Sequence, residues 1–170
     1  MNNLDKMFNL LASAFVLKEP YTKGVPSKYL ILKRSDKEKS FPGMWTVPGG
    51  KVHQSDYTNT PRETKEYWYN VLEKGLRREV KEESGIEIKN ISYLTSLARL
   101  TTEGHGSLVL SFIAEYAGGE IELEENMVDS AWVTYEEAKS YDLIDGILDE
   151  IYLAERKLTG EKDVEWQRAV

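Results

Sequence analysis

The chain carries the stretch Arg78-Glu79-Val80-Lys81-Glu82-Glu83-Ser84-Gly85-Ile86. Three of its carboxylates fall within five residues, since Glu79 lies three residues before Glu82 and four before Glu83. Side chains at these spacings are neighbours on a helix surface, where like charges repel. Such a helix is either a solvated charged face or a holder of cations, and ligand sets made of oxygen suit a hard ion such as Mg²⁺.

The preceding residues predict that these acids lie at the end of a long helix. Thr60 is suited to cap a helix, Pro61 to occupy its first position, and Glu63 to complete a capping box. The helical pattern continues to Ser84, and Gly85 is a suitable C-terminal stop. We therefore expect one helix from about Thr60 to Ser84.

The apolar face of this helix consists of Leu72, Leu76 and Val80. Glu83 follows Leu76 by seven residues, or two turns, and so projects close to that face. A carboxylate at the border of the core is costly unless it is paired or bound to a cation. A solvated position without a cation is therefore a less suitable interpretation for Glu83 than for Glu82.

Composition limits the remaining possibilities. The 170 residues favour one domain, and a hydrophobic content of 41% is enough for a packed core. The net charge of −7 argues against a broad grip on nucleic acid. With no cysteine and only two histidines, a thiolate site or a histidine-rich metal site is not expected.

No part of the sequence is typical of a membrane or secreted protein. Apolar runs stay below the roughly 18 residues that a bilayer span requires. Residues Met1–Lys6 lack the basic and then apolar pattern of a signal peptide. We expect a cytoplasmic protein without a membrane partner.

Strands are predicted on both sides of the acidic helix. Apolar, alternating or β-branched runs indicate strands over Leu10–Lys18, Tyr29–Lys33, Ile91–Leu100, Leu108–Tyr116 and Ala131–Val133, of which the first two are a candidate hairpin. A second capping box starts at Thr134, and helical spacing of isoleucines predicts a C-terminal helix to about Lys157. We expect the polar tail, residues 158–170, to be loosely held.

These residues resemble the signature of the Nudix hydrolases. In that family a glycine, five residues, a glutamate and seven residues precede Arg-Glu-aliphatic-x-Glu-Glu-x-Gly-aliphatic. The second half matches completely at Arg78, Glu79, Val80, Glu82, Glu83, Gly85 and Ile86. The approach segment Trp45–Val52 is also similar to the family's, and the resemblance covers about residues 8–157. It implies one α/β domain over residues 1–170, a Nudix fold with a mixed β-sheet sandwiched between α-helices.

The first half of the signature departs from the pattern. Five residues separate Gly50 from Asp56, which stands where the family usually has glutamate. Between Asp56 and Arg78 lie 21 residues instead of seven, which indicates an insertion of fourteen, at about residues 57–70. These departures bear on the choice of substrate more than on the metal-binding half.

The resemblance implies roles for the acidic cluster. Glu79, Glu82 and Glu83 would be metal ligands and catalytic residues, together with the backbone carbonyl of Gly50. The cofactor would be Mg²⁺, with Mn²⁺ as a substitute. Arg78 would orient a carboxylate through its planar guanidinium.

Further site residues lie outside the helix. We assign Arg34, Trp45 and Gly49 to substrate binding. Many relatives place an additional glutamate six residues before a tryptophan, a position that Asn126 occupies here. The neighbouring Glu125 is therefore our candidate for the general base or an extra ligand, with a plain surface acid as the alternative.

The resemblance implies a hydrolase acting on acid anhydrides. It would cleave the diphosphate linkage of a small-molecule nucleotide, a nucleoside triphosphate or a nucleotide-sugar type of substrate, by attack of water on phosphorus.

The alternative is a non-catalytic module of the same fold that binds a nucleotide metabolite and regulates another process. An isomerase of prenyl diphosphates is disfavoured because that chemistry is associated with a cysteine. Whether the protein forms a homodimer stays open.

The predicted insertion is rich in aromatic residues, namely Tyr57, Tyr67, Trp68 and Tyr69. These rings are suited to stacking on a nucleotide base. They are equally suited to packing the insertion onto the body or to a contact between two copies. Packing onto the body is the reading we favour from the sequence.

Overall fold

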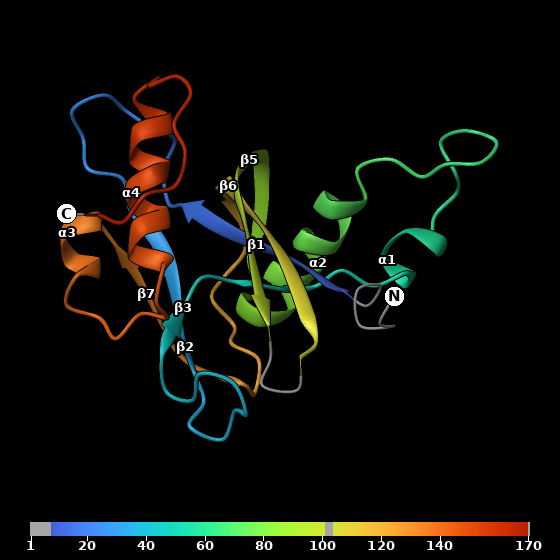
Figure 1. Ribbon diagram of the computed structural model, residues 1–170, viewed down its shortest axis with the longest axis horizontal. Helices are drawn as coiled ribbons and strands as arrows, with labels where there is room; N and C mark the ends of the chain where they lie inside the picture. The colour runs from blue at the N-terminus through green and yellow to red at the C-terminus, as the bar shows by residue number, and fades with distance from the viewer. Residues whose placement is uncertain (1–7, 101–103, 170) are drawn as a thin grey trace.

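A sheet with helices on both faces forms the body of the protein, as seen in the computed structural model, which describes residues 8–100 and 104–169 (Figure 1). Its strands are β1 (Phe8–Leu17), β2 (Tyr29–Arg34), β3 (Trp45–Thr46), β4 (Gly49–Lys51), β5 (Glu87–Leu100), β6 (Gly106–Gly118) and β7 (Met127–Val133). Its helices are α1 (Ser55–Thr58), α2 (Val71–Ser84), α3 (Tyr135–Ala138) and α4 (Ile147–Leu158). Part of the predicted loop after Leu100 and the segment Met1–Lys6 lie outside the described residues.

The sheet is mixed, which confirms the predicted fold class. The main order of strands is β3-β2-β1-β6-β5, while β4 pairs with β1 and β7 pairs with β2. The β1–β6 pair is parallel and the other pairs are antiparallel. The predicted hairpin is reduced to a brief antiparallel contact of Leu17 with Tyr29, because β1 is occupied by β6 along its length and by β4 at its middle.

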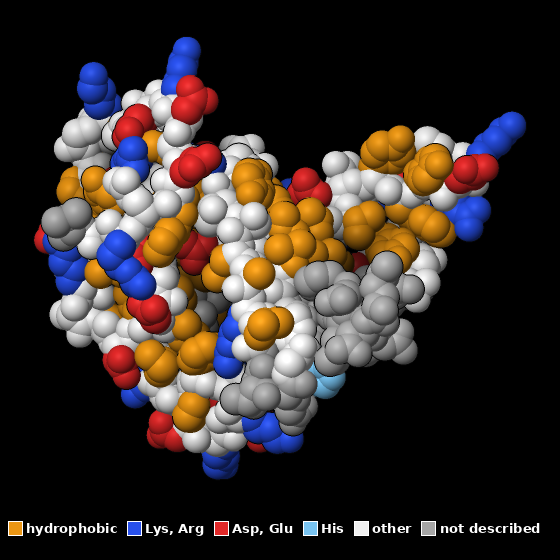
Figure 2. All heavy atoms as spheres, in the orientation of Figure 1, with side chains coloured by type: hydrophobic (Ala, Val, Ile, Leu, Met, Phe, Trp, Pro, Cys, Tyr) orange, Lys and Arg blue, Asp and Glu red, His pale blue; other side chains and the backbone are white. Residues whose placement is uncertain are grey.

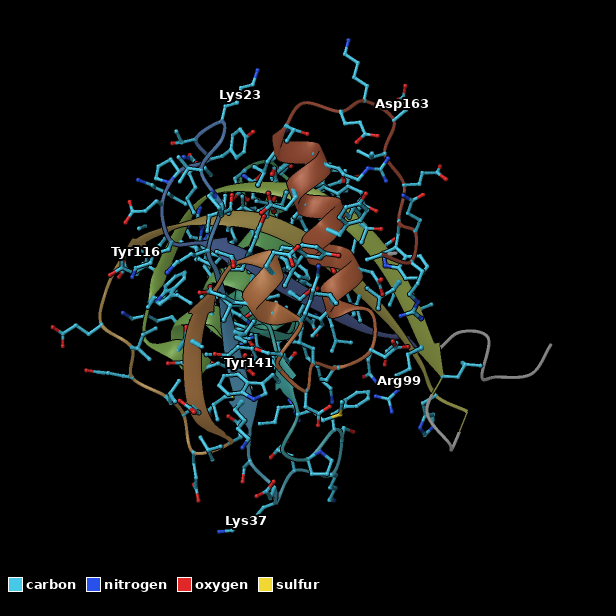
Figure 3. The ribbon with its side chains drawn as sticks, turned by 90° about the vertical axis from the view of Figure 1, so that its left-hand side faces the viewer. Lys23, Lys37, Arg99, Tyr116, Tyr141 and Asp163 are labelled. Carbon is cyan, nitrogen blue, oxygen red and sulfur yellow. The ribbon has the colours of Figure 1, made fainter. Side chains whose placement is uncertain are left out.

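Alternation along β1 distributes its side chains between two cores. Ala12, Ala14 and Val16 pack on one face of the sheet with residues of α2, whereas Phe15 and Leu17 pack on the other face with residues of α4. Successive side chains of a strand point to opposite faces. The two helices therefore cover opposite faces, and Figure 3 views the molecule from the α4 side.

The acidic helix is shorter than the sequence indicates, so the prediction that it begins near Thr60 was wrong. Helix α2 begins at Val71, after Asn70 in a left-handed conformation with φ of 53°. The Thr60 carbonyl accepts a hydrogen bond from the Trp68 indole instead of from a helical N–H. Residues 59–70 have no apolar periodicity, so a helix there would have no face to bury. The C-terminal stop at Gly85, with φ of 76°, is as predicted.

The C-terminal tail is held to the body, contrary to expectation. The Arg168 guanidinium donates to the carboxylates of Asp145 and Asp149, at 2.7 and 2.8 Å. The Ala169 N–H also donates to Asp149, whose side chain is almost fully buried.

Strand β7 starts four residues earlier than predicted, at Met127. Among the described residues, no helix combines the length and the apolar character needed to cross a membrane.

Candidate functional site

The centre of the acidic helix is organised by Arg78. Its Nε and Nη2 donate to the two carboxylate oxygens of Asp56, at 2.5 and 3.1 Å. Its Nη1 donates to Glu79 at 2.9 Å and to Glu82 at 2.7 Å, and Nη2 also donates to the Lys51 carbonyl. One guanidinium therefore joins α1, β4 and two of the predicted metal ligands.

Asp56 is the site residue that the sequence-based assignment missed. Its carboxylate accepts the His53 N–H at 2.7 Å as well as the Arg78 bonds, and its side chain is only 3% exposed. The hydrogen bonds from Arg78 hold the pKa of this carboxyl below its usual range. Its separation from Gly50 by five residues was the available signal, since this is the glutamate position of the signature.

Glu83 lies where its spacing predicts, at the border of the core. It is 6% exposed, and its Oε2 accepts the N–H of Gly49 at 2.8 Å. Burial raises its pKa to about 8, against the opposing effect of the Gly49 hydrogen bond, and the charge of Glu79 contributes to the rise. The Gly49 hydrogen bond thus offsets only part of the cost of burying this carboxylate.

Glu79 lies against Gly50. A Cβ on Gly50 would overlap the Glu79 carboxylate, so a larger residue there would displace this carboxylate. Burial raises the pKa of Glu79, while Arg78 opposes the shift and Glu82 adds to it. Glycines 49 and 50 and two of the predicted ligands, Glu79 and Glu83, therefore form one site between β4 and α2.

The carboxylate oxygens of these acids are suitable ligands for a hard divalent cation, but the side chains are not arranged as a preformed coordination site. The carboxylates of buried Glu83 and partly buried Glu79 have raised pKa values and form a site at which a cation would stabilise the charged forms. Glu82 is instead half exposed and turned to Arg78. Within the parts of the chain that the structure describes, no three acidic, histidine or cysteine side chains are grouped closely enough to hold a metal ion.

The loop before β7 brings Glu124 toward the site. The Glu124 N–H donates to the backbone carbonyl of Glu83, and the charge of Glu124 contributes to the raised pKa of Glu83. Glu125, the predicted base, is exposed in the adjacent turn. The side-chain oxygen of Asn126 is buried without a hydrogen-bond partner, and the Asn126 carbonyl accepts the Ser35 N–H.

Of the residues assigned to substrate binding, Arg34 lies at the edge of the site. Its positive charge lowers the pKa of Glu83, and its guanidinium donates to Glu38 at 2.7 Å and to the Ser40 carbonyl at 2.9 Å. Trp45 packs edge-on against Tyr141, labelled in Figure 3, with ring centroids 4.9 Å apart. Trp45 is thus engaged in the core on the α4 side, and its contact with substrate stays a prediction.

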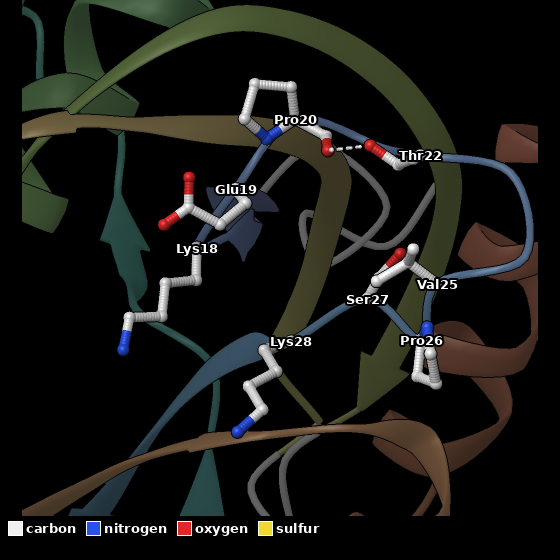
Figure 4. A pocket seen from close by; sticks show the side chains of 8 residues that line it. All are labelled: Lys18, Glu19, Pro20, Thr22, Val25, Pro26, Ser27 and Lys28. Carbon is white, nitrogen blue, oxygen red and sulfur yellow. Dashed lines mark hydrogen bonds between the residues drawn. The ribbon is translucent and has the colours of Figure 1, made fainter.

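A pocket of about 240 Å³ lies away from the acids, in the loop between β1 and β2 (Figure 4). Pro20, Val25, Pro26 and Ser27 are among the residues that surround it, and the side chains of Lys18 and Lys28 extend from its rim. Gly49 and Gly50 pair with the middle of β1, at Ser13 and Ala12, several residues before this loop. The pocket therefore does not contain the acidic site.

Comparison with known proteins identifies the family. Residues 12–153 match the family described as NUDIX domain, and this match covers most of the chain. The chain therefore belongs to the Nudix family.

Individual relatives are more distant. A stretch of 67 residues, 39% of this chain, is 39% identical to the NAD-capped RNA hydrolase NudC of Citrobacter koseri and of Escherichia coli, and it spans a quarter of the length of those proteins. The fold is similar to that of a MutT protein from Methanosarcina mazei, with a TM-score of 0.64 and 23% identity over 91% of this chain and 98% of the other. It is also similar to the NUDIX domain of Shewanella oneidensis NrtR in complex with ADP ribose, with a TM-score of 0.65 and 20% identity over 88% of each chain.

Proposed function

We propose that this chain is a Mg²⁺-dependent hydrolase of the diphosphate linkage in a nucleoside diphosphate joined to another group. Nucleoside triphosphates and nucleotide sugars are examples of such substrates. The observation that carries the proposal is the pair of carboxylates of buried Glu83 and partly buried Glu79, held against Gly49 and Gly50 with raised pKa values. Retaining both acids there is costly unless a cation binds between them and a substrate phosphate.

Each residue has a role in this proposal. Glu79, Glu83 and the Gly50 carbonyl would hold the cation, and the exposed Glu82, which contacts Arg78 here, would supply a further carboxylate. Arg78 keeps Glu79 in place through the bond of 2.9 Å. When bound, Mg²⁺ or Mn²⁺ neutralises phosphate charge and lowers the pKa of a water molecule.

The reaction is a displacement at phosphorus. The oxygen of a water molecule forms a bond to one phosphorus while the bridging P–O bond breaks, and the leaving phosphate takes the electron pair. Arg34 is suited to bind phosphate oxygens by exchanging its contact with Glu38 for them. The proton of the attacking water passes to a base from the loop before β7.

The base is either Glu125, as predicted, or Glu124, whose charge acts on Glu83. Each candidate supplies a carboxylate on the same loop. Rates of the single variants Glu124→Gln and Glu125→Gln distinguish them, because the base is the one whose loss removes the acidic limb of the pH–rate profile.

A non-catalytic binding module is the alternative. Two observations favour it: the carboxylates of the described residues do not converge into a cage, and the NUDIX domain of NrtR was solved with ADP ribose. Turnover of any diphosphate compound in the presence of metal decides against this alternative, whereas binding without turnover decides for it.

The test of the proposed function is a screen of nucleotide diphosphate compounds with Mg²⁺, run with the wild type and Glu83→Gln. We expect the wild type to release products with a phosphomonoester from at least one compound. The variant should be slower by about 10²-fold, the scale of losing one key electrostatic group. Glu165→Gln, in the exposed tail, is the matched control and should behave as the wild type. Equal rates for the wild type and Glu83→Gln would remove Glu83 from the mechanism.

A further inference from the structure

An arm, defined as residues 59–70, connects α1 to α2 and projects away from the body (Figure 1). Its core is Trp68, whose indole N–H donates to the Thr60 carbonyl at 2.9 Å. The Arg62 guanidinium lies 4.5 Å from the centre of the Trp68 ring, and the Tyr57 ring of α1 lies 5.4 Å from it. The arm is therefore a built structure with its own contacts.

The charged side chains of the arm balance one another. Arg62 and Lys65 are offset by Glu63 and Glu66, which leaves the arm without net charge. Glu63 accepts hydrogen bonds from Lys74 of α2 at 2.7 Å and from the Tyr69 N–H at 3.1 Å. An arm without net charge offers no broad electrostatic grip on a polynucleotide backbone.

Two aromatic side chains of the arm are left open to solvent. Tyr67 is 61% exposed and Tyr69 is 54% exposed, so the packing onto the body that the sequence favoured does not describe them. Figure 2 shows hydrophobic side chains on the arm and on the face of the body across an open notch. The arm thus presents flat, uncharged rings beside the body.

Both ends of the arm lead to the acidic site. Helix α1, just before the arm, carries Asp56, which binds Arg78. Helix α2 begins directly after the arm, and Glu79 follows Asn70 by nine residues, or about 13 Å along the helix axis. A dinucleotide has a ring system on each side of its pyrophosphate, and one half extends over a comparable length.

We propose that Tyr67 and Tyr69 stack on the second ring system of a dinucleotide, the one across the pyrophosphate from the adenosine. The arm would thereby select dinucleotide-type substrates. This inference rests on the proposed function, since the pyrophosphate must bind at Glu79 and Glu83. Stacking requires only an exposed aromatic face and tolerates different bases. The arm supplies such faces and carries no net charge.

The experiment compares NAD⁺ with ADP-ribose, which has the same diphosphate and adenosine but lacks the nicotinamide ring. For the double variant Tyr67→Ala/Tyr69→Ala we expect the KM for NAD⁺ to rise about tenfold or more, as for the loss of a stacking partner. The kcat for NAD⁺ and both constants for ADP-ribose should stay within about twofold of the wild type, since no group that touches the pyrophosphate is changed. Tyr93→Ala, which removes a tyrosine of similar exposure (53%) on β5, is the control.

Three results would overturn the inference. An unchanged KM for NAD⁺ means that the rings do not contact the substrate. An equal loss for NAD⁺ and ADP-ribose means that the arm acts on the shared half of the molecule or on the acidic site. A wild type that is dimeric and a double variant that is monomeric, measured by light scattering, would assign Tyr67 and Tyr69 to a contact between copies.

Calorimetry separates this inference from the proposed function. If the wild type hydrolyses neither compound, its binding of NAD⁺ and ADP-ribose in Mg²⁺ still tests the arm. Weaker binding of NAD⁺ alone by the double variant supports the inference even then. No measurable binding of NAD⁺ to the wild type overturns it.

Discussion

At the scale of single residues, the site depends on a carboxylate that is not itself one of the predicted ligands. Asp56 fixes the plane of the Arg78 guanidinium through two bonds, and this directs Nη1 to Glu79 and Glu82. The pair forms although 21 residues separate its members. The arm between them therefore leaves the acidic site intact.

Asp56→Asn should weaken metal binding without unfolding the protein. The amide keeps the shape of the side chain but loses the charge that holds Arg78, so Glu79 is less well oriented. Loss of such an outer partner of a ligand typically costs about 10- to 100-fold in metal affinity, and Mn²⁺ binding followed by electron paramagnetic resonance measures it. Asp163→Asn, in the exposed tail, should leave the affinity unchanged. A wild-type affinity in Asp56→Asn would contradict the positioning role of Asp56.

At the scale of elements, the site depends on the close approach of β4 to β1. Gly49 has φ of 152°, and a Cβ there would overlap the Ala12 carbonyl and lie 2.6 Å from the Ser13 Cα. Its N–H, facing α2, binds Glu83. Strands β1 and β4 and helix α2 thus meet at Gly49, a position where a side chain does not fit.

Gly49→Ala should destabilise the fold far more than Gly24→Ala. Gly24 also has a positive φ, of 82°, but a Cβ added there would meet no atom within 4 Å. We expect about 1 kcal/mol for Gly24→Ala, from backbone strain alone, and about 3 kcal/mol or more for Gly49→Ala, from strain and overlap with backbone atoms. Urea unfolding of the three proteins gives the free energies of unfolding. Equal losses would mean that β4 moves away from β1 at little cost.

At the scale of the whole molecule, a second buried acid joins the α4 layer to the sheet. Glu150 is 6% exposed and accepts a hydrogen bond from the Ser111 hydroxyl at 2.5 Å, and Ser111 lies 3.1 Å from the Ser13 hydroxyl. Burial raises the pKa of Glu150 from 4.5 to about 7, against the effect of Ser111. The folded protein therefore binds a proton at Glu150 more tightly than the unfolded chain does.

This shift predicts a pH dependence of stability that Glu150→Gln removes. Between about pH 4.5 and pH 7 the unfolded chain releases the Glu150 proton while the folded protein retains it. The free energy of unfolding should therefore fall as the pH rises through this window, by about 3 kcal/mol from this residue, and level off above it.

Urea unfolding without divalent metal, at steps from pH 4.5 to pH 8, measures this dependence. The difference between the wild type and Glu150→Gln isolates Glu150 from Glu83, whose pKa is also raised. Only the pH dependence of the two proteins is compared, because the amide changes the contact with Ser111, and with it the absolute stability, at every pH. Parallel curves for the two proteins would show that Glu150 titrates normally in the folded state.

Local patterns determined much of this protein. The spacing of Arg78, Glu79, Glu82 and Glu83, with the stop at Gly85, predicted the end of the helix and the family to which the chain belongs. Alternation identified most strands, and the position of Glu83 beside the apolar face predicted its burial. These features are readable because helix and strand periods and glycine stops depend on neighbouring residues.

Only the tertiary structure decided the start of α2, the parallel pairing of β1 with β6, the Asp56–Arg78 pair and the docking of the tail through Arg168. Each depends on groups far apart in the sequence. The capping signal at Thr60 failed for the same reason, because the Trp68 indole, eight residues away, takes the carbonyl that a helix would have used. A residue's neighbours in the chain set its preferences, whereas the partners that folding brings to it decide which preference is realised.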